Sequence, residues 1–513
     1  MRIALFALVL LGALGLTLQM GIEQAGAAIE EGAAAVPAAP EEPAAEGQNQ
    51  PAHGQRDLQQ ELGRILSPWT VIPFVILLLS IALVPLIHGR WWESNLNKGA
   101  VSALCGLPIA AYLFWIGPSG IEVLAEILKD YYAFIILLVA LFTISGGIYL
   151  EGDLRATPLV NTAFLGLGAV LASFIGTTGA AMLLIRPLLN TNRERKIKKH
   201  IFVFAIFVIA NIGGSLLPVG DPPLFLGYLF GVPFFWTLRL FPLWAAEIGM
   251  LLTLFFVWDT WAYSRERPED LRRDVQERTR LEIRGALNIV LILAVLCSVV
   301  FLKDYRIAGY EIHVAWMQQP AMILLALISY VLDHKKKEKA RRGGDNGFQT
   351  PREKNAFTFY PMIEVAVLFI GIFITMTPAI CLLKAHGAET NVTEPWQFFW
   401  MSGFLSSFLD NAPTYATYFA LGQGVTQGLM ASASDLPVVA SHTGPIAEGI
   451  LMAVSAGSVF MGANTYIGNA PNFMVRSICE EAKVKMPSFF GYMLFSGGIL
   501  IPSFLVITYL FFR

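Results

Sequence analysis

Two carboxylates stand in segments that otherwise have the composition of membrane helices. Asp221 lies in GGSLLPVGDPPLF (213–225), and Asp410 lies in FLDNAPTYATYF (408–419). An ionisable side chain at membrane depth is costly unless it is paired or hydrated, which makes each a functional candidate. A carboxylate in such a place can hold either a proton or a hard cation such as Na⁺. The alternative is that each Asp caps the free amide groups of a half-helix.

Each carboxylate is accompanied by small and polar residues that suit a broken membrane helix or the tip of a re-entrant hairpin. The first expected tip contains Thr177 and Thr178, and the second contains Asp410, Asn411 and Thr414. Their hydroxyl, amide and carboxylate oxygens are ligands that suit Na⁺. We therefore expect a cation and proton site where the tips meet broken helices near the membrane midplane.

Composition places these candidates in a membrane protein. The chain has 513 residues, of which 55% are hydrophobic and only 14% are charged, with a formal net charge of −2. Soluble domains carry about 25% charged residues. A soluble enzyme, a nucleic-acid binder and a disulfide scaffold are thereby disfavoured. The four cysteines stand singly in apolar segments, so we expect no resident metal or cofactor. The expected partners are lipid and small ions.

The N-terminal region differs from the rest of the chain. Residues 1–27 combine an early Arg2, an apolar run and a small-x-small pattern at 25–27, which predicts a signal peptide. An uncleaved first membrane helix is the alternative. Residues 28–66 are rich in Ala, Pro, Glu and Gly, which predicts a disordered tail. We expect a multi-pass protein of the bacterial inner membrane with its mature N-terminus in the periplasm.

Ten spanning helices and two hairpins account for the apolar segments. Lys and Arg gather in the loops of one side, as the positive-inside rule requires. The expected hairpins are 159–189 and 396–422. The expected spans are 68–88, 99–117, 131–150, 201–230, 241–263, 286–302, 317–333, 357–383, 446–475 and 488–512.

This layout repeats itself with opposite orientation. The predicted fold is an all-α polytopic membrane protein with two inverted repeats, 67–284 and 285–513, each of five spanning helices and one re-entrant hairpin. GGSLLPVGDPPLF (213–225) and MGANTYIGNAPNF (461–473) align without gaps, and their prolines require helix breaks. The glycines shared by the two breaks are Gly214 with Gly462 and Gly220 with Gly468.

Three further acids, Glu247, Glu364 and Glu448, each lie inside an apolar span. A relay or site role is one interpretation of each. Hydrogen bonding between helices, or a place near the interface, is the other.

Four motifs together resemble a known family: GTTGAAMLLIRPLL, NIGGSLLPVGDPPLFLGYLFGVPFFW, FLDNAPTYATYF and GANTYIGNAPNFMV. They are similar to the NhaD-like sodium/proton antiporter and citrate-transporter branch of the ion-transporter superfamily, over about residues 65–513. The resemblance implies inverted repeats, an elevator-type motion and a homodimer. It also implies site roles for Thr177, Thr178, Asp410, Asn411, Thr414, Gly214, Asp221, Asn464, Thr465 and Asn469.

The resemblance leaves several transport functions open. A Na⁺/H⁺ antiporter is favoured, with Asp410 as the main ion-binding carboxylate and Asp221 as the second acid. Competition of Na⁺ and H⁺ for this site would itself enforce exchange. A Na⁺-coupled citrate or dicarboxylate carrier is the alternative. The resemblance implies that dicarboxylate carriers of this superfamily have Ser-Asn-Thr at both hairpin tips. This chain has that sequence at neither tip. An anion efflux permease is a third reading. No enzymatic activity is expected, and the chain has no phosphate-binding loop for ATP.

Overall fold

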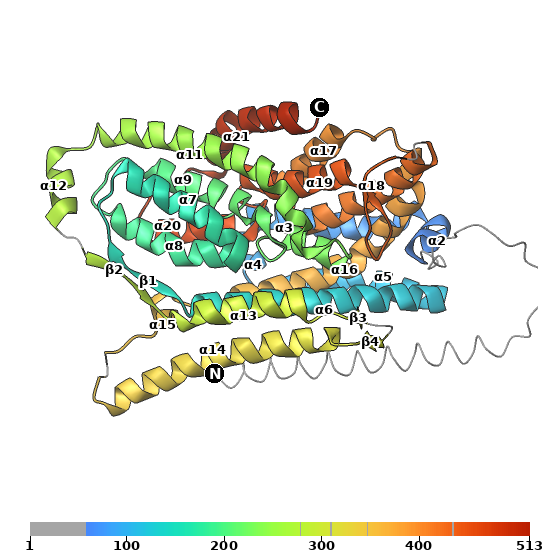
Figure 1. Ribbon diagram of the computed structural model, residues 1–513, viewed down its shortest axis with the longest axis horizontal. Coiled ribbons are helices and arrows are strands. Elements are labelled where there is room, and N and C mark those ends of the chain that lie inside the picture. The colour runs from blue at the N-terminus through green and yellow to red at the C-terminus, as the bar shows by residue number, and fades with distance from the viewer. Residues whose placement is uncertain (1–57, 277–278, 308–309, 346, 433–434) are drawn as a thin grey trace, which may run out of the picture.

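The computed structural model describes residues 58–276, 279–307, 310–345, 347–432 and 435–513 (Figure 1). Within these ranges, nine helical segments are long and apolar enough to cross a membrane. The prediction of an all-α, multi-pass membrane protein is therefore confirmed at this level. The nine segments are Pro68–Pro85, Asn95–Ile116, Pro118–Gly146, Pro158–Ile175, Lys199–Leu216, Phe234–Tyr263, Ala315–Arg342, Tyr360–Glu389 and Phe489–Phe511.

One group of long helices packs around α16 and α6. Helix α16 contacts α2 (Leu58–Ile65), α3, α5 and α6. Helix α6 also contacts α13 and α14. Helices α13 and α14 lie along one edge of the molecule in Figure 1. The helices of this group are α3 (Ile72–Ile87), α5 (Asn95–Ile116), α6 (Pro118–Gly146), α13 (Leu287–Phe301), α14 (Gln318–Arg342) and α16 (Tyr360–His386).

A short helix, α2 (Leu58–Ile65), lies in the last part of the segment expected to be a disordered tail. It packs against α16, and Leu62 is 1% exposed. A Cβ atom on Gly63 would lie 2.0 Å from the carbonyl oxygen of Cys381, so only glycine permits this close approach. The expected boundary at residue 66 is therefore too late. The expected signal peptide (1–27) and residues 28–57 lie outside the described residues.

The first hairpin consists of α7 (Pro158–Ile175) and α8 (Thr177–Thr191). Only Gly176 separates them, and its φ of +78° is a conformation that favours glycine. The helix that follows is broken into α9 (Lys199–Val208), η2 (Ile212–Leu216) and α10 (Pro222–Leu229). The paired prolines begin α10, as their missing amide hydrogens favour.

The second hairpin consists of α17 (Pro395–Phe408) and α18 (Asn411–Ser432), so its second arm is longer than expected. The helix that follows is again broken, into α19 (Glu448–Phe460), η6 (Met461–Asn464) and α20 (Ala470–Glu481). Each broken helix is followed by one long helix, α11 (Phe241–Tyr263) or α21 (Phe489–Phe511). These two pack against each other along the opposite edge from α14 (Figure 1).

The remaining elements lie in connections between helices. The strands described form antiparallel pairs: β1 (Tyr149–Asp153) with β2 (Thr279–Arg284), β3 (Tyr305–Ile307) with β4 (Tyr310–Ile312), and β5 (Val438–Val439) with β6 (Ile446–Ala447). The short helices are η1 (Pro68–Val71), α4 (Gly89–Trp92), η3 (Phe234–Leu240), α12 (Pro268–Gln276), η4 (Ala315–Met317), α15 (Pro351–Lys354) and η5 (Gly387–Glu389).

Candidate functional site

Asp221 lies at the centre of a buried cluster that draws on both halves of the chain. Its side chain is 1% exposed. Oδ1 accepts a hydrogen bond from Thr177 Oγ1 at 2.9 Å and from Asn469 Nδ2 at 3.2 Å. Oδ2 accepts one from Asn411 Nδ2 at 2.9 Å. The first hairpin, the second hairpin and the second broken helix therefore converge on one carboxylate.

The Asp221 side chain is free for this role because it does not cap the half-helix beside it. Asp221 occupies the N-cap position of α10, but its side chain accepts no hydrogen bond from the α10 backbone. All three donors to the carboxylate are neutral. Within the described residues no Lys, Arg or His forms an ion pair with it. The capping interpretation considered for Asp221 does not match this geometry.

Asp410 is placed differently, although it adjoins Asn411. Its side chain is half-buried, and its Oδ1 accepts a hydrogen bond from the backbone amide of Ala412 at 3.2 Å. Thr414 is buried and donates from Oγ1 to the backbone carbonyl of Asp410 at 3.0 Å. The structure therefore shows Asp410 supporting the first turn of α18. Thr178 lies half-buried on the first turn of α8.

The tip of the second hairpin docks on the second helix break. Thr465 Oγ1 donates to the carbonyl of Ser407 at 2.5 Å and accepts from the amide of Gly468 at 3.1 Å. Asn464 Nδ2 donates to Ser407 Oγ at 2.9 Å. The other amide atom, Asn464 Oδ1, is buried without a hydrogen-bond partner. These hydrogen bonds of Thr465 and Asn464 join the tip to the break. Within the described residues, Asn464 Oδ1 remains able to accept a further hydrogen bond or contact a cation.

The first hairpin docks on its own break through the corresponding residues. Ser173 Oγ donates to the carbonyl of Gly213 at 2.6 Å, and Ser407 Oγ donates to that of Met461 at 3.1 Å. The amide of Thr177 donates to the carbonyl of Gly220 at 2.9 Å. Gly213 and Met461 are equivalent in the gapless alignment of the two breaks, and Ser173-Phe174-Ile175 resembles Ser407-Phe408-Leu409 at the tip end of the first arm of each hairpin. The same contact therefore recurs in both halves.

The four predicted break glycines lie where no side chain would fit. A Cβ on Gly214 would lie 2.6 Å from Thr177 Cγ2, and one on Gly462 would lie 2.2 Å from Asn411 Oδ1. A Cβ on Gly220 would lie 2.1 Å from the carbonyl oxygen of Gly214, and one on Gly468 would lie 2.5 Å from the carbonyl oxygen of Gly462. Each glycine thus lets a tip or a carbonyl approach the break.

Two asparagines that cross between the halves complete the cluster. Asn211 donates from Nδ2 to Asn472 Oδ1 at 2.6 Å, and its own Oδ1 accepts from Asn469 Nδ2 at 3.2 Å. Asn472 donates to the carbonyls of Gly462 and Thr465, both at 2.9 Å. From the sequence alone, Asn211 can serve equally in the site or in helix packing, and nothing beyond its spacing from Asn469 singles out Asn472. The spacing of Asn469 and Asn472, which places both on one helix face, was the available signal.

The cluster is suited to a hard cation or a proton. The hydroxyl of Thr177 can turn its hydrogen away, and the amides of Asn411 and Asn469 carry an oxygen beside the nitrogen. A Na⁺ ion at Asp221 would therefore find neutral oxygen ligands. In the part of the chain that the structure describes, no group of three His, Cys, Asp or Glu side chains is placed to hold a metal ion.

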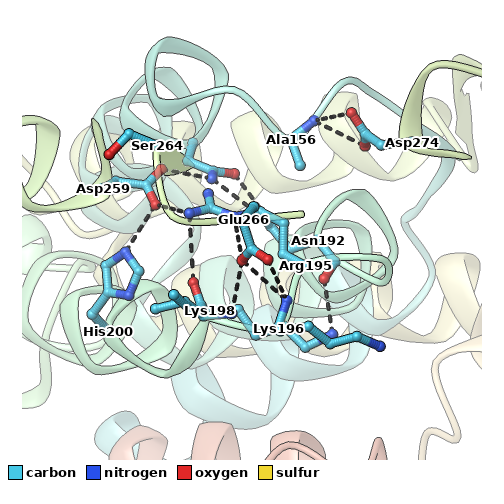
Figure 2. A network of polar contacts seen from close by, with 12 residues as sticks. Ala156, Asn192, Arg195, Lys196, Lys198, His200, Asp259, Ser264, Glu266 and Asp274 are labelled. Carbon is cyan, nitrogen blue, oxygen red and sulfur yellow. Dashed lines mark hydrogen bonds and ion pairs between the residues drawn. The ribbon is translucent and has the colours of Figure 1, made fainter. Parts of the chain in front are cut away.

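A second buried polar network lies at the N-terminal end of α9, the end away from the helix break (Figure 2). Asp259 on α11 accepts from Arg195 Nη2 at 2.6 Å, lies 2.8 Å from His200 Nε2 and accepts from Asn161 Nδ2 at 2.9 Å. Glu266 accepts from the backbone amides of Lys196 and Ile197 nearby. The network joins α7, α9, α11 and the α8–α9 connection. The sequence indicates only clustered Lys and Arg residues in a loop here.

Two of the three weaker acid candidates form ion pairs. Glu364 Oε1 lies 2.7 Å from Nζ of the buried Lys98, between α16 and α5. Glu448 at the start of α19 pairs with Arg239. Among the described residues, neither acid is one of the hydrogen-bond partners of the Asp221 carboxylate. Glu247 forms no such pair with any residue that the structure describes, and it is considered below.

Comparison with known families agrees with this architecture. No curated protein matches the chain significantly. The family described as "Putative citrate transport" matches residues 63–512, which include both hairpins, both helix breaks and the whole Asp221 cluster. The chain therefore belongs to this citrate-transport family of the ion-transporter superfamily.

Proposed function

We propose that this transporter is a Na⁺/H⁺ antiporter in which Asp221 is the carboxylate for which the two ions compete. The observation that carries the proposal is the surroundings of Asp221. It is 1% exposed and is contacted by Thr177, Asn411 and Asn469, with no basic partner among the described residues. A buried charge without a partner is strongly unfavourable. A bound proton or a bound cation removes that charge.

Exchange follows from this competition without a separate coupling device. When Asp221 is ionised, Na⁺ binds between it and the neutral oxygens of the tips. When Asp221 is protonated, the charge that held Na⁺ is gone and the ion leaves. Because the loaded forms are neutral at Asp221, they are the forms that can cross between the two sides. Asp410, in the next position to Asn411, adds a second negative charge near the site.

We further propose that the two halves are inverted repeats and that access to the site alternates between the two sides. The recurring contacts support this proposal. Ser173 and Ser407 donate to equivalent carbonyls, and Thr177 and Asn411 occupy equivalent tip positions on Asp221. Such repeats with broken helices are typical of secondary transporters.

Na⁺-coupled transport of citrate or a dicarboxylate is the second candidate, because the family description names citrate. The same cluster argues against it. An anionic substrate placed beside Asp221 and Asp410 would be repelled at short range. The described contacts of Asp221 come from neutral donors, which do not offset that repulsion.

Proteoliposomes that contain a pH-sensitive dye distinguish the two candidates. We expect a pulse of NaCl to move protons across the membrane when no organic anion is present. A later pulse of citrate should add nothing. Proton movement that requires citrate, together with Na⁺-dependent uptake of labelled citrate, would favour the second candidate.

A further inference from the structure

Glu247 is a buried acid that the Asp221 cluster does not use. It lies on α11, and its side chain is 0% exposed. Its Oε1 lies 2.7 Å from Oγ of Ser503 on α21. Its Oε2 is buried and has no hydrogen-bond partner among the described residues. Glu247 therefore sits between the two long helices at the edge of the molecule in Figure 1, with half of its carboxyl group unsatisfied.

No described cation neutralises Glu247. Helix α11 packs against α7, α9, α21, η2 and η3. Within the described residues α7 and η2 contain no titratable side chain, and α21 contributes only Tyr492 and Tyr509. Arg239 on η3 pairs with Glu448.

The other charged groups of these elements lie at the far end. Lys199 and His200 stand at the first residues of α9, and His200 contacts Asp259. Asp259 follows Glu247 by twelve residues on the same helix, which is about 18 Å. An ionised Glu247 would thus be an isolated buried charge, which is strongly unfavourable. The neutral acid is the form that suits this site.

The contact with Ser503 also fits a protonated Glu247. The hydroxyl of Ser503 has one hydrogen but two acceptors within reach, Glu247 Oε1 at 2.7 Å and the carbonyl of Leu500 at 2.9 Å. If Glu247 carries a proton, the acid donates to Ser503 and Ser503 donates to Leu500. Each of these two hydrogen atoms, on Glu247 and on Ser503, then has its own acceptor.

A donor for the ionised form stands one turn away. Nε1 of Trp244 is buried without a partner, and Trp244 lies three residues before Glu247 on the same helix face. An ionised Glu247 could accept from it after a change of side-chain rotamer. An ionised Glu247 would keep the hydrogen bond that Ser503 can donate and gain one from Trp244.

The two helices that enclose Glu247 also contact both helix breaks. Helix α11 packs against η2, and α21 packs against η6. Ser496 of α21 donates to the carbonyl of Asn464 at 2.6 Å. Ser503 follows Ser496 by two turns, about 10 Å along the helix. The Glu247–Ser503 contact is therefore joined to both helix breaks through the two helices that form it.

We infer that Glu247 is a second proton-binding site of the transport cycle, so that more than one proton is exchanged for each Na⁺. This inference rests on the proposed Na⁺/H⁺ exchange. The step is a proton transfer alone: the carboxylic acid of Glu247 releases H⁺ to water on one side, and the carboxylate takes up H⁺ on the other. Asp221 alternates between H⁺ and Na⁺ in the same cycle.

The ratio of protons to Na⁺ tests the inference in proteoliposomes whose membrane potential is clamped at zero. With two protons per Na⁺, a tenfold Na⁺ gradient is balanced by a pH difference of about half a unit, and with one proton by about one unit. We expect a balancing pH difference of about half a unit for the wild type and for Glu247→Asp, which keeps a titrating acid. We expect a balancing pH difference of about one unit for Glu247→Gln. Glu338→Gln, in an exposed pair on α14, is the matched control for reconstitution.

The possible results separate the inference from the proposed function. Equal balance points in the wild type and in Glu247→Gln would overturn the inference and leave the antiport intact. Absence of Na⁺-driven proton flux in the wild type would overturn both. If Glu247→Gln carries no flux, infrared spectra of purified protein decide. A carboxylic-acid carbonyl band that responds to pH and is lost in Glu247→Gln supports the site, and its absence from the wild type rejects it.

Discussion

In the proposed mechanism, Na⁺/H⁺ exchange depends on the carboxyl group of Asp221. Replacing it with Asn keeps the size and part of the hydrogen bonding to Thr177, Asn411 and Asn469, but it removes the charge that binds Na⁺. We predict that Asp221→Asn abolishes Na⁺-driven proton flux in proteoliposomes while the protein still inserts and purifies as a folded species. Flux at the wild-type rate in this variant would remove Asp221 from the mechanism.

Asp410 should be less critical, because its described side-chain contact is with the backbone amide of Ala412. The side-chain oxygen of Asn accepts the same hydrogen bond. We predict that Asp410→Asn keeps measurable exchange with a weaker apparent affinity for Na⁺, since one negative charge near the site is lost. The measurement is the Na⁺ concentration that gives half-maximal proton flux. Complete loss of flux in Asp410→Asn, with full activity of Asp221→Asn, would reverse the order of the two acids.

At the scale of the elements, the close contact of each hairpin tip with a helix break should control transport. An added Cβ on Gly462 would lie 2.2 Å from Asn411 Oδ1 and would push that tip away from Asp221. We predict that Gly462→Ala lowers the exchange rate at least tenfold with little change in helix content. Gly498→Ala on α21 is the matched control, because nothing lies within 4 Å of its added Cβ. Equal loss in both variants would indicate a general effect on membrane helices.

The sequence predicted these elements better than it predicted their contacts. Pro222, Pro223 and Pro471 each stand close to Gly and Asp or Asn, and this combination predicted the helix breaks. Proline alone does not suffice, because Pro108 and Pro378 lie inside continuous helices. The pairing of Asn211 with Asn472 joins residues 261 positions apart, and no local pattern encodes it. The relative importance of Asp221 and Asp410 likewise depends on which side chain faces the other half. The helical end of the tail was missed because α2 is stabilised by its packing on α16.

At the scale of the whole molecule, the network around Asp259 should hold the first hairpin, α9 and α11 together. Arg195 and Asp259 are fully buried, with side-chain exposures of 1% and 0%. Removing Asp259 leaves the buried guanidinium of Arg195 with only its longer contact to Glu266, at 3.6 Å. Breaking a buried ion pair by removing one partner costs about 3–5 kcal/mol. We predict that Asp259→Ala lowers the thermal unfolding temperature in detergent markedly. Glu338→Gln, whose pair with Arg342 is exposed, should change stability by less than about 0.5 kcal/mol. An unchanged unfolding temperature in Asp259→Ala would show that the network does not stabilise this bundle.

Competition between Na⁺ and H⁺ for one buried carboxylate is tested most directly by the pH dependence of the apparent Na⁺ affinity. The measurement is Na⁺-driven proton flux in proteoliposomes across a range of pH, with no organic anion present. Protonation removes the anion that binds Na⁺, so the affinity should weaken as pH falls. The change should approach about tenfold per pH unit for each competing proton where the carboxyl group is mostly protonated. An apparent Na⁺ affinity independent of pH, or the absence of flux at every pH together with Na⁺-dependent citrate uptake, would contradict the account.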